Sequence, residues 1–219
     1  MIRFFDLLLS IAALLALSPL LILIIVILSL TGEREIFYKQ KRIGINGKDF
    51  FVLKFATMLK NSESIGSKTI TIKDDKRVLF FGKFLRKTKI NELPQLINVV
   101  CGSMSLVGPR PLVEEQFNFY EKKHRENITL VLPGITGLGS IVFRNEEKFF
   151  GDNNDPKIIF SQKIIPMKGI LETWFIENKS IYNYFKIIFL TALSILLPNM
   201  KVLNFFDKEL LNKYNSIFR

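Results

Sequence analysis

The stretch Lys89-Ile90-Asn91-Glu92-Leu93-Pro94-Gln95 carries the strongest local signals in this sequence. Asn is among the best N-caps of a helix, and a proline is tolerated in the first turn because its missing N–H would have no partner there. The pattern therefore predicts a helix over residues 92–100 that Asn91 caps and Gly102 ends. In this arrangement Asn91 lies at a helix N-terminus, where unpaired backbone N–H groups favour an anion.

An uncharged apolar segment extends from Leu7 to Gly32. At about 1.5 Å per residue it is long enough to cross roughly 30 Å of hydrocarbon. Pro19 in its middle removes a helical hydrogen bond, so we expect a kink, which the hydroxyl of Ser18 can partly compensate. A kinked spanning helix and a re-entrant helix both fit this segment, since basic residues flank it on both sides. A cleaved signal peptide is disfavoured because the apolar run is too long.

The remaining segments predict short elements on a mainly helical background. Asn46-Gly47, between two runs of β-branched and aromatic residues, indicates a β-hairpin. Residues 77–87 and the tail after Val202 place apolar residues at helical spacing among lysines and arginines, which is typical of amphipathic helices at a membrane interface. A short helix packed on the protein core fits residues 77–87 equally well. The expected fold class is α+β, mainly helical.

The composition favours a membrane surface as the environment of this protein. The 219 residues carry a net charge of +11 together with 48% hydrophobic residues, a combination suited to anionic lipid headgroups. No recognised nucleic-acid-binding motif accompanies the charge, so we expect no nucleic-acid partner. The single cysteine, Cys101, excludes an intrachain disulfide framework and a cysteine-rich zinc site.

Taken in order, a series of short motifs resembles the bacterial sugar transferases, the small monotopic phosphoglycosyl transferases. The similarity extends from Phe5-Asp6 to about Leu197, which is nearly the whole chain. The matching pieces are Ser18-Pro19, Gln40-Lys41-Arg42-Ile43-Gly44, Lys54-Phe55 with Thr57-Met58, Leu85-Arg86-Lys87-Thr88, Glu92-Leu93-Pro94-Gln95, Asn98-Val99, Met104-Ser105-Leu106-Val107-Gly108-Pro109-Arg110-Pro111, Pro133-Gly134-Ile135-Thr136-Gly137, Arg144-Asn145 and Glu177-Asn178-Lys179-Ser180. No single motif is decisive, but the ordered series is specific.

The resemblance implies an activity and a location. Family members transfer a sugar-1-phosphate from a UDP-sugar to polyprenyl (undecaprenyl) phosphate, the first step of polysaccharide or glycoconjugate assembly, as for exopolysaccharide and capsule. The resemblance implies a location at the bacterial inner membrane, with the catalytic domain facing the cytoplasm. It also implies membrane lipids and other glycosyltransferases as partners. It also favours a re-entrant helix at Ser18-Pro19. We therefore expect a monotopic protein with a membrane-embedded helix over residues 1–32, a cytoplasmic membrane-surface domain over residues 33–219 and amphipathic interfacial helices.

The resemblance also assigns the site residues. Family members use an Asp-Glu pair and Mg²⁺, the Asp attacking the β-phosphate while UMP leaves, and Asn91 and Glu92 occupy the positions of this pair. The residues at phosphate- or substrate-binding positions are Lys54, Pro109, Arg110 and Arg144. A guanidinium can bind phosphate oxygens with two hydrogen bonds, although each arginine also fits a structural ion pair.

Four positions depart from the family pattern. Asn91 replaces the nucleophilic Asp, Ala56 replaces a basic residue, and Ser103 and Tyr184 each replace an Asp. A neutral amide cannot act as the attacking carboxylate and is a poor ligand for Mg²⁺, so the metal ligands are unknown. Three hypotheses follow. The first is an active transferase with altered machinery, in which Glu92 is the remaining carboxylate. The second is a catalytically inactive relative that binds membrane, nucleotide-sugar or a partner enzyme, and the third and least favoured is a basic membrane-bound nucleic-acid or lipid binder. We expect restored activity to need Asn91→Asp combined with Ser103→Asp and Ala56→Arg.

Overall fold

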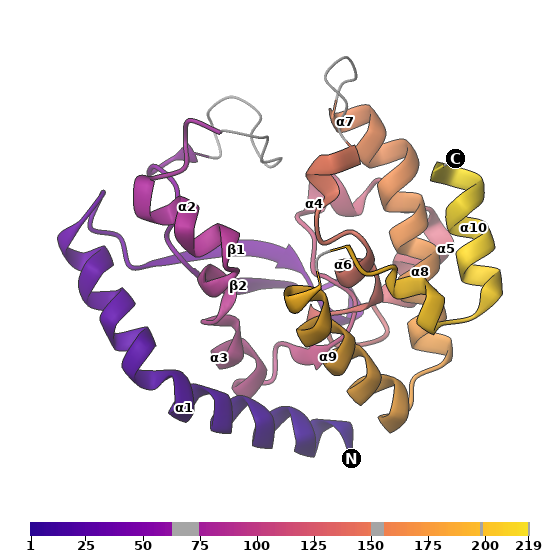
Figure 1. Cartoon of the computed structure of the whole chain (residues 1–219), viewed down its shortest axis with the longest axis horizontal. Coiled ribbons are helices and arrows are strands. Elements are labelled where there is room, and N and C mark those ends of the chain that lie inside the picture. The colour runs from indigo at the N-terminus through magenta and orange to yellow at the C-terminus, as the bar shows by residue number, and fades with distance from the viewer. Residues whose placement is uncertain (63–74, 150–155, 198, 219) are drawn as a thin grey trace. The chain divides into compact units, whose positions relative to one another are not determined.

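The computed structural model describes residues 1–62, 75–149, 156–197 and 199–218 (Figure 1). The chain divides into two compact units. The N-terminal unit comprises residues 3–41 and 50–104, and the C-terminal unit comprises residues 1–2, 42–49 and 105–219. The expected boundary between a membrane-embedded part over residues 1–32 and a surface domain concerns the membrane itself and stays a prediction.

Helix α1 (Ile2–Leu30) is one continuous helix that includes Pro19. The Ser18 hydroxyl donates a hydrogen bond to the carbonyl of Leu15 at 2.8 Å. The helix bends near its middle in Figure 1, as expected where a proline interrupts the hydrogen-bond ladder. Among the described residues, α1 is the one helix that is long and apolar enough to cross a membrane. The apolar N-terminal helix is therefore confirmed, and its re-entrant course stays a prediction.

A β-hairpin follows α1. Strands β1 (Phe37–Ile43) and β2 (Asp49–Phe55) form a two-stranded sheet, joined by the 3-10 turn η1 (Ile45–Gly47). Asn46 and Gly47 have φ values of 55° and 69°, the left-handed conformation that this residue pair tolerates. The predicted hairpin is confirmed.

Helix α2 (Phe80–Lys87) contributes to the core of the N-terminal unit. Leu85, fully buried, belongs to a cluster with Ile24, Leu28 and Phe55, and Phe81 packs against this cluster. The apolar face of residues 77–87, for which the sequence predicted a membrane interface, therefore packs inside the protein. This outcome matches the alternative of a short helix on the protein core.

The start of α2 lies later than predicted because Arg77 is held inside the protein. Its guanidinium forms a buried ion pair with Asp75, with Nη2 and Oδ2 at 2.5 Å and Nε and Oδ1 at 2.9 Å. This pair lowers the pKa of the Asp75 carboxyl. The aromatic side chains that α2 does expose are Phe80 and Phe84. The 3-10 turn η3 (Ile90–Glu92) and helix α3 (Gln95–Val100) complete the unit, and Gly102, with φ of 87°, follows the end of α3 as predicted.

The C-terminal unit contains a parallel pair of short strands. Strand β3 (Ser105–Val107) pairs with β4 (Gly134–Thr136), with Ser105 opposite Gly134 and Val107 opposite Thr136. Helices α4 (Glu114–Phe117) and α5 (Lys122–Ile128) form the connection between them. Because the strands are parallel, the loop after β3 and the helix α6 (Leu138–Val142) after β4 begin at the same edge.

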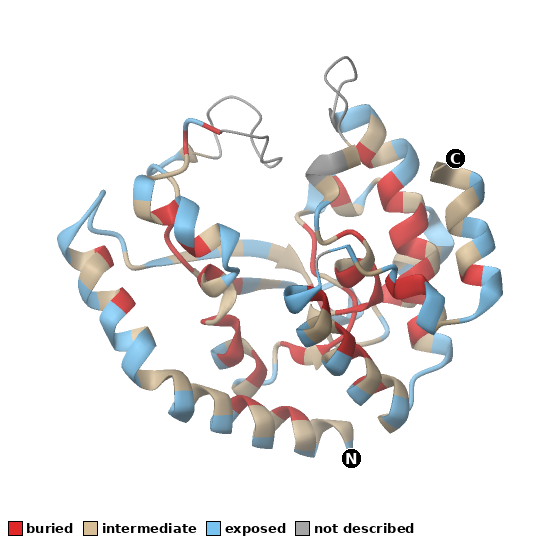
Figure 2. Cartoon of the chain, in the orientation of Figure 1, coloured by how far each residue is buried: buried red, intermediate tan, exposed pale blue. Residues whose placement is uncertain are grey.

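Helix α8 (Ile165–Glu177) is the centre of the C-terminal unit. It continues directly from α7 (Pro156–Ile159) and a π-helical segment, η5 (Phe160–Ile164), and packs against α5, α6 and α10. Figure 2 shows buried residues along most of its length. The remaining elements are η4 (Glu146–Phe149), α9 (Ile181–Leu196), η6 (Val202–Phe205) and α10 (Lys208–Phe218).

The C-terminal tail packs on its own unit. Leu210 is buried, and Tyr214 stacks on Phe218 while both rings contact Phe143. Phe206 meets the ring of Trp174 edge-on at 5.4 Å. The apolar face of the tail after Val202, for which the sequence predicted a membrane interface, therefore packs against the protein, because its aromatic rings contact other rings there.

Candidate functional site

Asn91 lies in the 3-10 turn η3 and does not cap a helix, in contrast to the sequence prediction. The Glu92 N–H bonds to the carbonyl of Lys89, and helix α3 begins only after Pro94. A proline has no N–H for the α-helical bond, so the chain before it is held by shorter-range bonds. Asn91 is 6% exposed, and its Oδ1 has no hydrogen-bond partner among the described residues. The start of the helix is therefore displaced from Asn91. The unpaired N–H groups and the helix dipole that would favour an anion are displaced with it.

A strained residue precedes this turn. Lys89 has φ of 61° and ψ of 11°, a left-handed conformation that costs a residue with a β-carbon about 1 kcal/mol or more. The strain fixes the direction in which the chain enters the turn that holds Asn91. No sequence signal marks it, because lysine has no preference for this conformation.

Strand β2 brings Lys54 next to Glu92. The Lys54 ammonium is 3.6 Å from the Glu92 Oε1 atom, and both side chains are 15% exposed. The structure thus places three predicted site residues together in the N-terminal unit, since Asn91 is adjacent to Glu92 in the chain. The result is one carboxylate, one ammonium and one neutral amide.

Asn98 fixes this arrangement, although it was not predicted as a site residue. Its Oδ1 accepts the backbone N–H of Leu53 at 2.9 Å, and its Nδ2 donates to the carbonyl of Phe51 at 2.8 Å. These bonds tie α3 to the strand that carries Lys54. The Ser103 hydroxyl lies 3.2 Å from the same Nδ2, so this departure from the family pattern is part of the same network. A polar residue inside the apolar run of α3 is the signal that marks Asn98.

Two other departures occupy packed positions. Ala56 is 7% exposed, and its N–H bonds to the carbonyl of Ile36 at 3.0 Å. Tyr184 is 1% exposed and meets Phe185 edge-on within α9. A charged residue at either position would lose its hydration. The two replacements therefore suit the packing that this structure shows.

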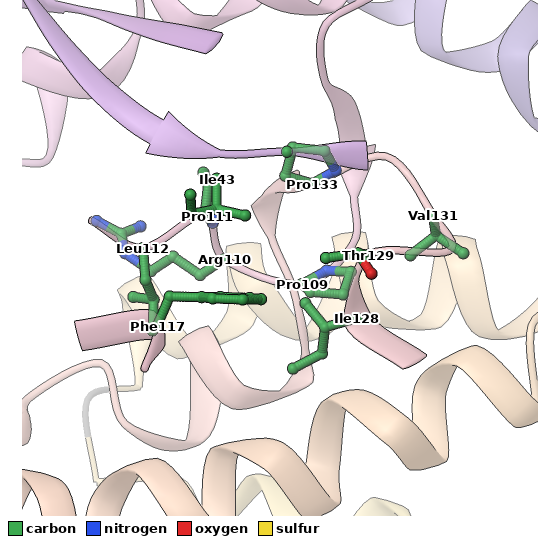
Figure 3. A pocket seen from close by; sticks show the side chains of 11 residues that line it. Ile43, Pro109, Arg110, Pro111, Leu112, Phe117, Ile128, Thr129, Val131 and Pro133 are labelled. Carbon is green, nitrogen blue, oxygen red and sulfur yellow. The ribbon is translucent and has the colours of Figure 1, made fainter. Parts of the chain in front are cut away.

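Arg110 lies in the loop after β3, between two prolines. The carbonyl of Pro109 accepts the N–H of Gly134, which fastens this loop to β4. Figure 3 shows Pro109 and Arg110 lining a mostly apolar hollow, with the Arg110 side chain extending away from Pro133. The loop thus combines an apolar wall with a guanidinium that can bind phosphate oxygens.

Arg144 follows α6 and donates a hydrogen bond from Nη1 to the Ser194 hydroxyl at 3.2 Å. Ser194 is neutral and 6% exposed, so this bond orients the guanidinium without neutralising it. An oriented arginine whose bond partner is uncharged keeps its charge for an anion. The phosphate-binding role of Arg144 stays a prediction, and the printed hydrogen bond is to a neutral hydroxyl group.

Glu172 on α8 is a buried acid that was not predicted as a site residue. It is 1% exposed, and its carboxyl group accepts the backbone N–H groups of Arg110 and Gly139. Burial raises its pKa to about 8, although Lys168 and the two N–H groups oppose this change. The signal in the sequence is a single acidic residue in an apolar helical stretch.

The site residues fit the implied Mg²⁺ poorly. Among the described residues, no group of three or more His, Cys, Asp or Glu side chains is placed to hold a metal ion. Mg²⁺ is usually held by one or two carboxylates with substrate phosphates. Here Glu92 is the one carboxylate of the expected pair, and a lysine ammonium already lies beside it. The two-carboxylate arrangement that the resemblance implies is not formed.

The family of the chain follows from sequence comparison. The family described as bacterial sugar transferase matches residues 1–198. The chain belongs to the bacterial sugar transferase family, as the order of its motifs predicted.

Three relatives illustrate the family. The exopolysaccharide production protein ExoY of Sinorhizobium fredii (strain NBRC 101917 / NGR234) is 39% identical over 161 residues, which cover 67% of this chain and 71% of the relative. The uncharacterized sugar transferase EpsL of Bacillus subtilis (strain 168) is 34% identical over 198 residues, covering 89% of this chain and 86% of EpsL. The UDP-glucose:undecaprenyl-phosphate glucose-1-phosphate transferase of Xanthomonas campestris pv. campestris is 38% identical over 144 residues, 64% of this chain but 30% of that longer protein.

Proposed function

We propose that this protein transfers a sugar-1-phosphate from a UDP-sugar to undecaprenyl phosphate at the cytoplasmic face of the bacterial inner membrane. The observation that carries the proposal is family membership over residues 1–198, together with a relative whose name states this reaction. The largely exposed apolar surface of α1 supports membrane attachment. The product would be the lipid-linked sugar from which a polysaccharide is built.

The replacement at position 91 constrains the chemistry. In the proposed reaction an oxygen of the lipid phosphate forms a bond to the β-phosphorus of the donor. The bond from that phosphorus to the bridging oxygen breaks, and UMP leaves with the electron pair. The transfer is direct because Asn91 offers no carboxylate to attack phosphorus, and the neighbouring Glu92 carboxylate is paired with Lys54.

The charged residues would act on the phosphates. We assign Lys54 to the negative charge of the transferred group, with Glu92 holding its ammonium in place at 3.6 Å. We assign Arg110 and Arg144 to phosphate oxygens, which a guanidinium can bind with two hydrogen bonds. A requirement for Mg²⁺ stays a prediction, and adding EDTA to the assay described below tests it.

A second candidate function is supported by the environment of Asn91. The side chain is buried and its Oδ1 lacks a partner among the described residues, while the fold around it is intact. An inactive relative that binds the membrane, a nucleotide-sugar or a partner glycosyltransferase would show these features.

The test is UMP release in nanodiscs that contain undecaprenyl phosphate, with a panel of UDP-sugars. We expect UMP release by the unaltered protein with at least one donor, loss of release in Glu92→Gln, and no effect of Glu177→Gln, a change to an exposed glutamate of α8. Binding of UDP-sugar without UMP release would establish the inactive relative instead. A phosphosugar attached to the protein, detected by mass spectrometry, would contradict direct transfer.

A further inference from the structure

The buried carboxyl group of Glu172 joins two segments that follow neighbouring strands. Arg110 comes after β3 and Gly139 lies in the first turn of α6, after β4. Since the strands are parallel, both segments start at one edge, and Glu172 on α8 accepts a backbone N–H from each. The Glu172 side chain therefore connects the start of α6 to the loop of residues 109–111.

The sequence Pro109-Arg110-Pro111 gives this contact its importance. A proline has no backbone N–H, so Arg110 carries the only N–H of the three residues. A hydrogen bond donated by the backbone of this segment must therefore come from Arg110. Glu172 accepts that bond, which limits rotation of the peptide that carries the arginine side chain.

The surrounding backbone leaves little space beside the carboxyl group. A β-carbon built on Gly139 would lie 2.6 Å from Oε1, and one on Gly137 would lie 3.3 Å from Oε2. Side chains at these two positions would therefore displace the carboxyl group. The glycines allow the close approach on which both hydrogen bonds depend.

Glu172 is an unfavourable choice for stability alone. It is 1% exposed, its Oε2 has no hydrogen-bond partner within the described part of the chain, and the nearby Lys168 ammonium is paired with Glu146 at 2.6 Å. Burying a carboxyl group with an unpaired oxygen costs free energy, which a well-packed apolar side chain at this position would avoid. A role in function would account for a glutamate here.

We infer that Glu172 is a positioning residue, which holds the backbone of Arg110 against the start of α6 so that the guanidinium meets a substrate phosphate in a fixed orientation. This inference rests on the proposed function, because it needs Arg110 to bind a phosphate of the donor. Glu172 itself does not contact the substrate in this role.

The test compares three variants in UDP affinity, measured by isothermal titration, and in hydrogen exchange of the Arg110 amide. Glu172→Met has similar volume without an acceptor oxygen, Glu172→Gln keeps an acceptor, and Glu177→Gln is the exposed control on the same helix. We expect Glu172→Met to weaken UDP binding about tenfold or more and to speed exchange at Arg110. Glu172→Gln should stay near the unaltered protein in both measurements, as should Glu177→Gln.

Three results would overturn the inference. They are unchanged UDP affinity in Glu172→Met, unchanged exchange at Arg110 in that variant, and an equal loss in Glu172→Gln. Should Glu172→Met fail to fold, Gly139→Ala takes its place, because the added β-carbon would displace Oε1 and should loosen Arg110 in the same way. An unaltered protein that does not bind UDP would refute the proposed function, whereas exchange at Arg110 would still show whether Glu172 holds the loop.

Discussion

At the scale of single residues, Lys54, Asn91 and Glu92 form a locally neutral group. The ammonium and the carboxylate are 3.6 Å apart and largely buried, so their charges compensate each other. A second carboxylate at position 91 would leave this group with excess negative charge, which a cation would have to neutralise. Asn91 removes that requirement together with the nucleophile.

Asn91→Asp should lower the free energy of unfolding, because the side chain is 6% exposed and caps no helix. A buried carboxyl has a raised pKa, so the loss should be fully present at neutral pH and should vanish below the unfolded pKa, about 4. We expect roughly 1–3 kcal/mol at pH 7. Thermal unfolding of both proteins at pH 4 and pH 7 measures this. Equal stability at pH 7 would show that a nearby positive charge compensates the new carboxylate.

The structure also changes what is needed to restore a covalent mechanism. Ala56→Arg, part of the combination that the sequence suggested, would place a guanidinium at a position that is 7% exposed. Such a change is expected to disturb the fold before it improves activity. Asn91→Asp alone is therefore the cleaner variant in which to look for a phosphosugar attached to the protein.

At the scale of elements, the clearest prediction concerns the course of α1 in the membrane. We expect a re-entrant course, with Ile2 and Glu33 both on the cytoplasmic side, because Pro19 bends the helix and basic residues flank it. Cysteines introduced at these two positions should resist a membrane-impermeant maleimide in intact cells and react after permeabilisation. The background is Cys101→Ser, since the native cysteine is exposed and free.

Labelling of either cysteine from outside would refute the re-entrant course. Pro19→Ala serves as the comparison, because a straighter helix should span the bilayer more readily and expose one of the two positions.

Individual elements show how far periodicity can predict structure. The apolar run of α1 and the turn at Asn46-Gly47 were predicted correctly, because length and local turn chemistry decide both. The environment of residues 77–87 was harder to predict, because the same spacing of apolar residues occurs in helices at a membrane interface and in helices packed on a protein core. What decides between these is Leu85 meeting Ile24 and Leu28 of α1, a contact between distant parts of the sequence.

At the scale of the whole molecule, the site was predictable only in part. The family motifs predict a set of site residues whose roles stay predictions, namely Asn91, Glu92, Lys54, Pro109, Arg110 and Arg144. Asn98 and Glu172 were missed because their partners are backbone groups of other elements, namely Leu53 for Asn98 and Arg110 and Gly139 for Glu172. The identity of a residue does not reveal which distant N–H it will accept.

The stability of the molecule should depend on Glu172 and pH. Burial raises its pKa to about 8 from an ordinary 4.5, despite the opposing charges of Lys168 and Arg110, while Tyr120 and Glu146 lie in the same surroundings. The folded state therefore keeps a proton that the unfolded state releases, so the free energy of unfolding falls as pH rises from 4.5 to 8, by at most about 1.4 kcal/mol per pH unit.

Glu172→Gln should remove this dependence. We expect it to be more stable than the unaltered protein at pH 8, with the difference shrinking towards pH 5. Denaturant unfolding across that pH range measures it. Parallel curves for the two proteins would contradict a raised pKa at Glu172.

The contact of Glu172 with two earlier segments of the chain also has a consequence during protein synthesis. Arg110 leaves the ribosome first, Gly139 follows after α4 and α5, and Glu172 comes last with α8. At roughly 5–20 residues per second, both amides wait several seconds for their acceptor. A nascent chain that ends before α8 therefore exposes them to solvent or to chaperones. We infer that the Arg110 amide gains its acceptor only when α8 docks, whereas the bond between Gly134 and the Pro109 carbonyl can form once β4 has been made.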